Sequence, residues 1–119
     1  MNIYESAENY LEAILIIKNE KGTVRSIDIA NHLNFSKPSV SVAMKNLRQN
    51  GYISIDSDGY ISLNESGQKI AAKIYERHTL ISSWLMKLGV SQKTASEDAC
   101  RIEHILSEES FEAIKNHVK

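Results

Sequence analysis

The 119-residue chain contains one cysteine, one proline and no long hydrophobic run. A single cysteine excludes an internal disulfide, so we expect a reducing, cytoplasmic location. No apolar stretch approaches the roughly 18 residues of a membrane span. The early glutamates Glu5 and Glu8 do not fit the basic start of a signal peptide. Apolar residues make up 42% and charged residues 24% of the chain, a composition typical of a globular domain rather than a disordered tail.

The sequence also lacks the motifs of common enzymes. Its five glycines form no phosphate-binding loop. The one thiol, Cys100, has a histidine partner, His104, only one helical turn away, and no oxyanion hole is evident. We therefore predict that the chain is not an enzyme and has no small-molecule substrate.

The net charge of −1 conceals an uneven distribution. Residues 18–50 hold six basic side chains and only two acidic ones, whereas the stretches before 18 and after 90 are acidic. A basic block in a neutral chain is usually a solvated surface. It indicates nucleic-acid binding only if the fold presents it to phosphates.

Residues 5–49 have the pattern of three helices. Apolar residues spaced three or four apart predict a helix over 5–20. Ser26 is the expected N-cap of a short second helix. Ser36 is the expected N-cap of a third helix reaching Gln49, with Pro38 in its first turn.

The period then changes from helix to strand. Ile53 and Ile55 alternate with polar residues, Asp58-Gly59 supplies a tight turn, and alternation resumes to Leu63. This pattern predicts a β-hairpin. Three helices followed by a hairpin are the element order of a winged helix-turn-helix, a DNA-binding module.

The second half is predicted to be entirely helical. We expect a long helix over 64–88, a second over 91–107 and a short third to the end of the chain. The fold class is therefore mainly α, with a winged helix-turn-helix DNA-binding domain over 1–63 and a helical dimerisation and metal-binding domain over 64–119. The long helix has more than one apolar face, which predicts a homodimer; the extra apolar residues are Leu80, Trp84, Leu85 and Leu88.

In a winged helix-turn-helix the third helix enters the major groove. We expect one face of this helix to be buried, through Val40, Ala43, Met44 and Leu47. The opposite face and its surroundings would neutralise phosphates and let the backbone approach the DNA closely. The residues predicted to bind double-stranded DNA are Arg25, Lys37, Ser39, Ser41, Lys45 and Arg48. The alternative is a winged helix used for protein contact.

Three side chains of the predicted helix over 91–107 have the chemistry of metal ligands. Cys100, Glu103 and His104 are spaced i, i+3 and i+4, so they project from one face. Singly, each has a structural explanation, because an isolated cysteine is more often a small buried hydrophobe than a ligand. Glu12 and His78 also lie at the edges of apolar stripes. Packing of these stripes could bring ligands from three helices to one point.

The chain resembles the diphtheria-toxin-repressor and manganese-transport-regulator (DtxR/MntR) family of metal-dependent transcriptional repressors. The resemblance covers nearly the whole sequence and is clearest in AENYLE (7–12), in Arg77-His78 and in EDACRIEH (97–104). It implies a homodimer that controls metal-uptake genes. It also implies the shorter, two-domain form, without the SH3-like third domain of iron-type members.

The resemblance further implies a set of metal ligands. Asn9 stands where manganese-type members have aspartate and iron-type members methionine. Glu12 is manganese-like and Cys100 is iron-like. Ser82 and Ser96 replace two ligands of the iron-type ancillary site, which we expect to be missing. The implied ligands are Glu12, His78, Cys100, Glu103 and His104, with Asn9 as a candidate sixth.

Ligand chemistry favours Fe²⁺, with Mn²⁺ next and Zn²⁺ or Co²⁺ accepted in vitro, because thiolate is soft and carboxylates are hard. The expected mechanism is that the ion holds the DNA-binding module against the dimerisation helices. Two recognition helices would then fit successive major grooves about 34 Å apart. Two alternatives stay open: a winged-helix regulator that responds to an organic ligand or a protein partner, and a metal-buffering protein without specific DNA binding.

Overall fold

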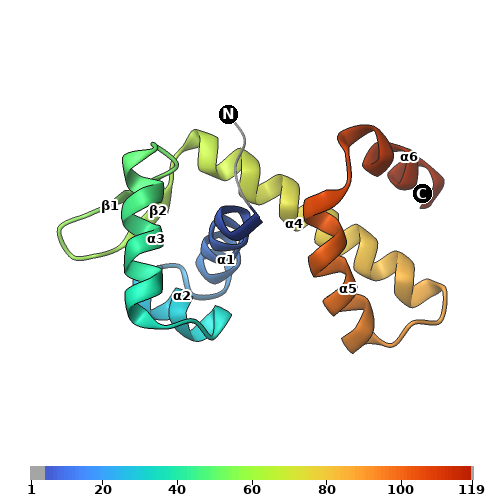
Figure 1. Ribbon diagram of the computed structural model, residues 1–119, viewed down its shortest axis with the longest axis horizontal. Helices are drawn as coiled ribbons and strands as arrows, with labels where there is room; N and C mark the ends of the chain where they lie inside the picture. The colour runs from blue at the N-terminus through green and yellow to red at the C-terminus, as the bar shows by residue number, and fades with distance from the viewer. Residues whose placement is uncertain (1–4, 119) are drawn as a thin grey trace. The chain divides into compact units, whose positions relative to one another are not determined.

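The computed structural model describes residues 5–118 and contains six helices and one antiparallel two-stranded sheet in that range (Figure 1). The chain divides into two compact units, one reaching Ala72 and the other beginning at Lys73, inside the fourth helix. The elements are α1 (Glu5–Lys21), α2 (Ser26–Leu33), α3 (Lys37–Gln49), β1 (Ile53–Ile55), β2 (Ile61–Leu63), α4 (Glu65–Lys87), α5 (Gln92–Ile105) and α6 (Glu108–Val118). The predicted mainly helical winged helix-turn-helix architecture is confirmed.

The first unit is built around one apolar core in which α1, α2 and α3 pack with the hairpin. The predicted inner face of α3 is confirmed, since Val40, Met44 and Leu47 are buried and Ala43 is partly buried. Their i, i+4, i+7 spacing leaves the opposite face of α3 in solvent. The other elements contribute Leu11, Ile14, Ile17, Val24, Ile29, Ile53, Ile61 and Ala71 to this core.

The start of α2 differs from the prediction in its N-cap. The N-cap is Arg25, not Ser26, and its backbone N–H donates to the Asp28 carboxylate at 2.9 Å. The same carboxylate accepts a 2.7 Å hydrogen bond from Lys21 of α1, which holds the pKa of Asp28 below its usual range. A carboxyl with a lowered pKa stabilises the fold above its ordinary pKa, and this contribution is lost as the pH falls through the lowered value.

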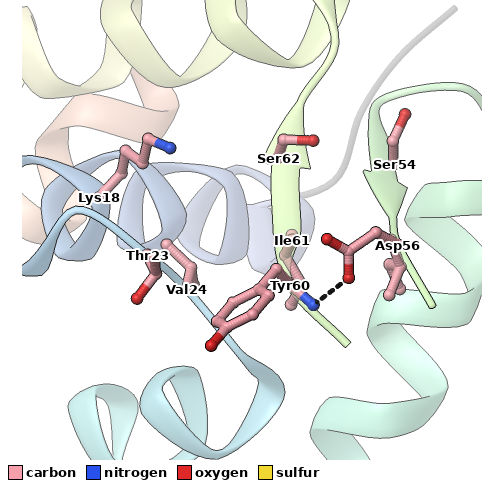
Figure 2. A pocket seen from close by; sticks show the side chains of 9 residues that line it. Lys18, Thr23, Val24, Ser54, Asp56, Tyr60, Ile61 and Ser62 are labelled. Carbon is pink, nitrogen blue, oxygen red and sulfur yellow. Dashed lines mark hydrogen bonds between the residues drawn. The ribbon is translucent and has the colours of Figure 1, made fainter. Parts of the chain in front are cut away.

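The hairpin pairs Ile53 with Leu63 and Ile55 with Ile61. Its turn is closed by Asp56, whose Oδ1 accepts hydrogen bonds from the backbone N–H groups of Asp58 and Tyr60 at 2.9 Å. Figure 2 shows the bond to Tyr60.

Besides its place in the apolar core, the hairpin makes a hydrogen bond and a cation–π contact with the segment that leads into α2. The N–H of Ile61 donates to the carbonyl of Val24 at 2.8 Å. The Arg25 guanidinium lies 4.4 Å from the centre of the Tyr60 ring, a cation–π contact. The hairpin, which is the wing of this fold, is therefore in direct contact with the beginning of α2.

The first turn of α4 packs closely on the end of α3 and the hairpin. The N–H of Asn64 donates to the carbonyl of Tyr52 at 2.9 Å. A Cβ added to Gly67 would lie 2.2 Å from this same oxygen. Only glycine permits this approach of α4 to the backbone of Tyr52, because any larger residue would have to displace main-chain atoms.

The second unit consists of the rest of α4 with α5 and α6. Its buried apolar residues are Ile74, Ile81, Ala95, Ala99 and Phe111. Gly89, at φ 104°, follows the end of α4. Ser91, where the predicted helix begins, is the N-cap of α5, and its Oγ accepts a hydrogen bond from the N–H of Thr94 at 3.3 Å. The helix α4 ends at Lys87, and Leu88, one of the apolar residues on which the predicted homodimer rests, is 66% exposed.

Among residues 5–118, none of the helices combines the length and apolar character that a bilayer crossing requires.

Candidate metal centre and DNA-binding surface

All the residues predicted to contact DNA are exposed in the first unit. They are Arg25 at the N-cap of α2 and, on α3, Lys37, Ser39, Ser41, Lys45 and Arg48. The segment 37–49 carries no acidic side chain, so its exposed face is purely basic and neutral. Such a face, presented by the third helix of this fold, is suited to the phosphates and bases of a major groove.

The N-terminus of α3 is shaped by two serines. Ser36 is the predicted N-cap, and its Oγ accepts a 3.3 Å hydrogen bond from the N–H of Ser39. The hydroxyls of the two residues lie 2.8 Å apart. Ser39 is thus engaged in the cap, while Lys37 and Ser41 line a surface hollow with Ser26 and Ile27 of α2.

A second hollow of about 290 Å³ lies beside the hairpin (Figure 2). Lys18, Thr23 and Val24 line one side, and residues 54–56 and 60–62 of the hairpin line the other. Lys18, Ser54 and Asp56 are exposed. The hollow therefore opens to solvent and lacks the enclosed, largely apolar character of a small-molecule site.

The second unit contains a buried carboxylate. The side chain of Glu103, on α5, is 0% exposed, and its Oε2 lies 2.9 Å from Nδ1 of His78 on α4. Its Oε1 is buried and makes no hydrogen bond with any of the residues that the structure describes. His104 Nε2 lies 3.5 Å from Oε1, a close approach that does not meet hydrogen-bond geometry.

Arg77 fixes the helix that carries this carboxylate. Its buried guanidinium donates to the carbonyls of Glu103 and Leu106 at 3.1 and 2.7 Å, and it lies 5.1 Å from the centre of the Phe111 ring. A cation on the last carbonyls of α5 is favourable because these groups carry the negative end of the helix dipole. Arg77 therefore joins α4 to both α5 and α6. The sequence prediction gave it no role.

The other predicted ligands differ in exposure. His104 has a buried side chain, 1% exposed, whereas Cys100, one turn before Glu103, is exposed. Glu12 and Asn9 belong to α1 in the first unit, where Glu12 is 8% exposed and Asn9 is partly buried. Within the second unit, Glu103 lies beside both histidines: its Oε2 is 2.9 Å from Nδ1 of His78, and its Oε1 is 3.5 Å from Nε2 of His104.

These residues fit a divalent cation. A buried carboxylate oxygen that accepts no hydrogen bond lowers the stability of the fold, and a bound cation would compensate its negative charge. Two ligands at about 2.1 Å from an ion and at right angles are separated by about 3.0 Å. The observed 2.9 Å between His78 Nδ1 and Glu103 Oε2 suits such a pair as well as it suits a hydrogen bond.

Family models match both parts of the chain. Residues 2–61 match the N-terminal DNA-binding domain of the iron-dependent repressors, and residues 64–119 match their metal-binding and dimerisation domain. The chain belongs to the iron-dependent repressor family. It is a member of the DtxR/IdeR type that is similar to MntR, as the resemblance predicted.

Individual relatives agree with this assignment. The chain is 38% identical to an uncharacterised HTH-type transcriptional regulator, MJ0568, of Methanocaldococcus jannaschii, over 93% of this chain and 90% of that protein. It is 34% identical to the transcriptional regulator MntR of Escherichia coli O6:H1, over 93% of this chain and 72% of that protein.

Two solved structures share the fold at 26% identity. The manganese regulator SloR superposes with a TM-score of 0.83 over 99% of this chain and 54% of its own. ScaR with bound Zn²⁺ superposes with a TM-score of 0.75 over 94% of this chain and 53% of the ScaR chain. The chain thus spans about half the length of each.

Membership of the iron-dependent repressor family defines the general function. The chain is a metal-dependent transcriptional repressor, not an enzyme. The two matched domains indicate a DNA operator and a second copy of the chain as its partners.

Proposed function

We propose that this repressor binds its operator as a homodimer when Fe²⁺ or Mn²⁺ occupies a site built from both units, and that it controls metal-uptake genes in the cytoplasm. The observation that carries the proposal is the buried Glu103 carboxylate, with one oxygen beside His78 and the other without a hydrogen bond among the described residues. The proposed ligands are Glu12, His78, Cys100, Glu103 and His104, with Asn9 as the sixth.

The proposed ligands divide between the two units. His78 and Glu103 are held by α4 and α5, which Arg77 joins. Glu12 and Asn9 are on α1, which belongs to the DNA-binding unit. A bound divalent cation would neutralise the carboxylates and restrict the first unit relative to the second. The division between the DNA-binding and metal-binding domains would lie near residues 63 and 64.

The choice of metal rests on the donor set. The buried donors, Glu103, His104 and Glu12, are oxygen and nitrogen groups that suit both Fe²⁺ and Mn²⁺. Participation of the Cys100 thiolate would shift the preference toward Fe²⁺. The relatives named manganese regulators support Mn²⁺ as the second choice. Zn²⁺, the ion bound in the ScaR structure, would be accepted in vitro.

Exposed apolar side chains of the second unit support the dimer. Leu88 and Ile105 are 66% and 77% exposed, so this unit leaves two large apolar side chains in solvent. A hollow of about 390 Å³ along α4, lined by Tyr75, Leu80 and Val118 among others, adds apolar surface. We propose that a second copy covers part of this surface, as the dimerisation-domain match supports.

The DNA-binding part of the proposal is tested with Lys45→Ala. Loss of a phosphate contact is expected to weaken binding to every sequence alike and to lower the slope of log affinity against log salt by about one. Fluorescence anisotropy over a range of KCl concentrations measures both quantities. The matched control is Lys93→Ala, an exposed lysine of α5, which should leave the slope unchanged. Equal slopes for wild type and Lys45→Ala would contradict a role of α3 at the phosphates.

A further inference from the structure

The outer face of α3 contains one exposed hydrophobic side chain, Val42. It is 62% exposed, the highest value among the large hydrophobic residues described in the first unit. The next in that unit, Phe35, is 45% exposed and packs edge-on against the Tyr10 ring at 5.8 Å. Packing within the unit therefore leaves Val42 with most of its side chain in solvent.

The position of Val42 follows from helix geometry. Successive residues of an α-helix are rotated by about 100°, so Val42 lies about 200° from Val40 and from Met44. Both of these neighbours are buried at 0–1% exposure. Val42 consequently points away from the core, at the centre of the surface that a major groove would receive. Lys45, one turn later, shares this outer face.

A valine at this place is not explained by helix stability. β-branched residues have lower helix propensity than lysine, glutamine or alanine. An isopropyl group that stays exposed to water also adds no hydrophobic stabilisation to the fold. The residues around it on α3 are basic or neutral, with no acidic side chain in the helix. This combination of positive charge and one small apolar group favours DNA as the partner over a protein surface.

In the major groove, the apolar group that base edges present is the 5-methyl of thymine. We infer that Val42 is a specificity-determining residue that contacts a thymine 5-methyl group in the operator. This inference rests on the DNA-binding function proposed above and adds the kind of base that the centre of α3 reads.

The test is a double-mutant cycle between protein and DNA. An operator is first selected from random duplexes with the full-length protein and saturating Mn²⁺. Each thymine of that operator is then replaced singly by deoxyuridine, which removes only the 5-methyl group. Binding of each duplex is measured for wild type and Val42→Ala. Lys45→Ala is the control, because a phosphate contact should not change the response to a base methyl.

We expect one thymine per half-site at which deoxyuridine weakens wild-type binding about fourfold, the value of one buried methyl group. The same replacement should change binding of Val42→Ala by less than about 1.5-fold, while Lys45→Ala keeps the fourfold loss. Thermal unfolding of Val42→Ala should occur at the wild-type temperature or slightly above it, because the side chain is exposed and alanine has the higher helix propensity.

Two results would overturn the inference while leaving DNA binding intact: an operator in which no deoxyuridine affects wild type, or equal losses for wild type and Val42→Ala. A selection that enriches no duplex at any metal concentration would overturn both this inference and the proposed function.

Discussion

Glu103→Gln is expected to lower metal affinity by on the order of 100-fold or more and to abolish metal-dependent operator binding. Glutamine keeps the size of the side chain but removes the negative charge at the centre of the proposed site. Replacing even an indirect partner of a metal ligand costs about 10- to 100-fold. Isothermal titration with Mn²⁺ under anaerobic conditions measures the affinity, and operator anisotropy measures the response.

The stability of the metal-free variant distinguishes this role from a structural one. A buried carboxylate with one oxygen lacking a hydrogen bond is costly. With the neutral amide of glutamine at this position, the free energy of unfolding of the metal-free protein should therefore be unchanged or slightly higher. The increase in melting temperature on adding metal should disappear. Glu97→Gln, an exposed position on the same helix, is the matched control and should behave as wild type.

The opposite pattern would contradict the assignment of Glu103 as a ligand. If Glu103→Gln lowered the stability of the metal-free protein by about 2–4 kcal/mol and left metal affinity intact, the carboxylate would be a structural partner of His78.

Glu12→Gln is expected to separate metal binding from DNA binding. His78, Glu103 and His104 in the second unit would still bind the ion, with an affinity reduced about 10- to 100-fold. Because the proposed link to the DNA-binding unit would be lost, saturating metal should change operator affinity by less than about twofold, against 10- to 100-fold for wild type. The measurement is operator anisotropy with and without saturating Mn²⁺.

Glu20→Gln is the control for this variant, because Glu20 is an exposed carboxylate at the end of the same helix. It should retain the full metal response. An unchanged metal response in Glu12→Gln would show that α1 contributes no ligand and that the two units communicate by another route.

Most of the fold was predictable because its signals are local. Helical spacing places Val40, Met44 and Leu47 inside, and alternating residues on either side of a turn form the hairpin. The turn itself lies one residue earlier than predicted, because the N–H of Gly59 donates to the carbonyl of Asp56. The serine cap at Ser36 was also predicted correctly. The N-cap of α2 was wrong, because the Asp28 carboxylate stabilises a start one residue earlier, at Arg25.

The centre of the second unit was less predictable because it depends on contacts between helices. The spacing of Cys100, Glu103 and His104 indicates a shared face but not that Glu103 is fully buried while Cys100 is exposed. Arg77 would be expected at the surface from its charge. Only packing against the end of α5 and against Phe111 explains its burial.

We propose that one metal site joins the two units and so controls DNA binding. The most direct measurement is a linked titration: operator affinity at several free concentrations of Fe²⁺, Mn²⁺ and Zn²⁺, and metal affinity with and without operator, all under anaerobic conditions. We expect metal to strengthen operator binding about 10- to 100-fold and operator to strengthen metal binding by the same factor. Operator affinity that is the same with saturating metal as with chelator would contradict it.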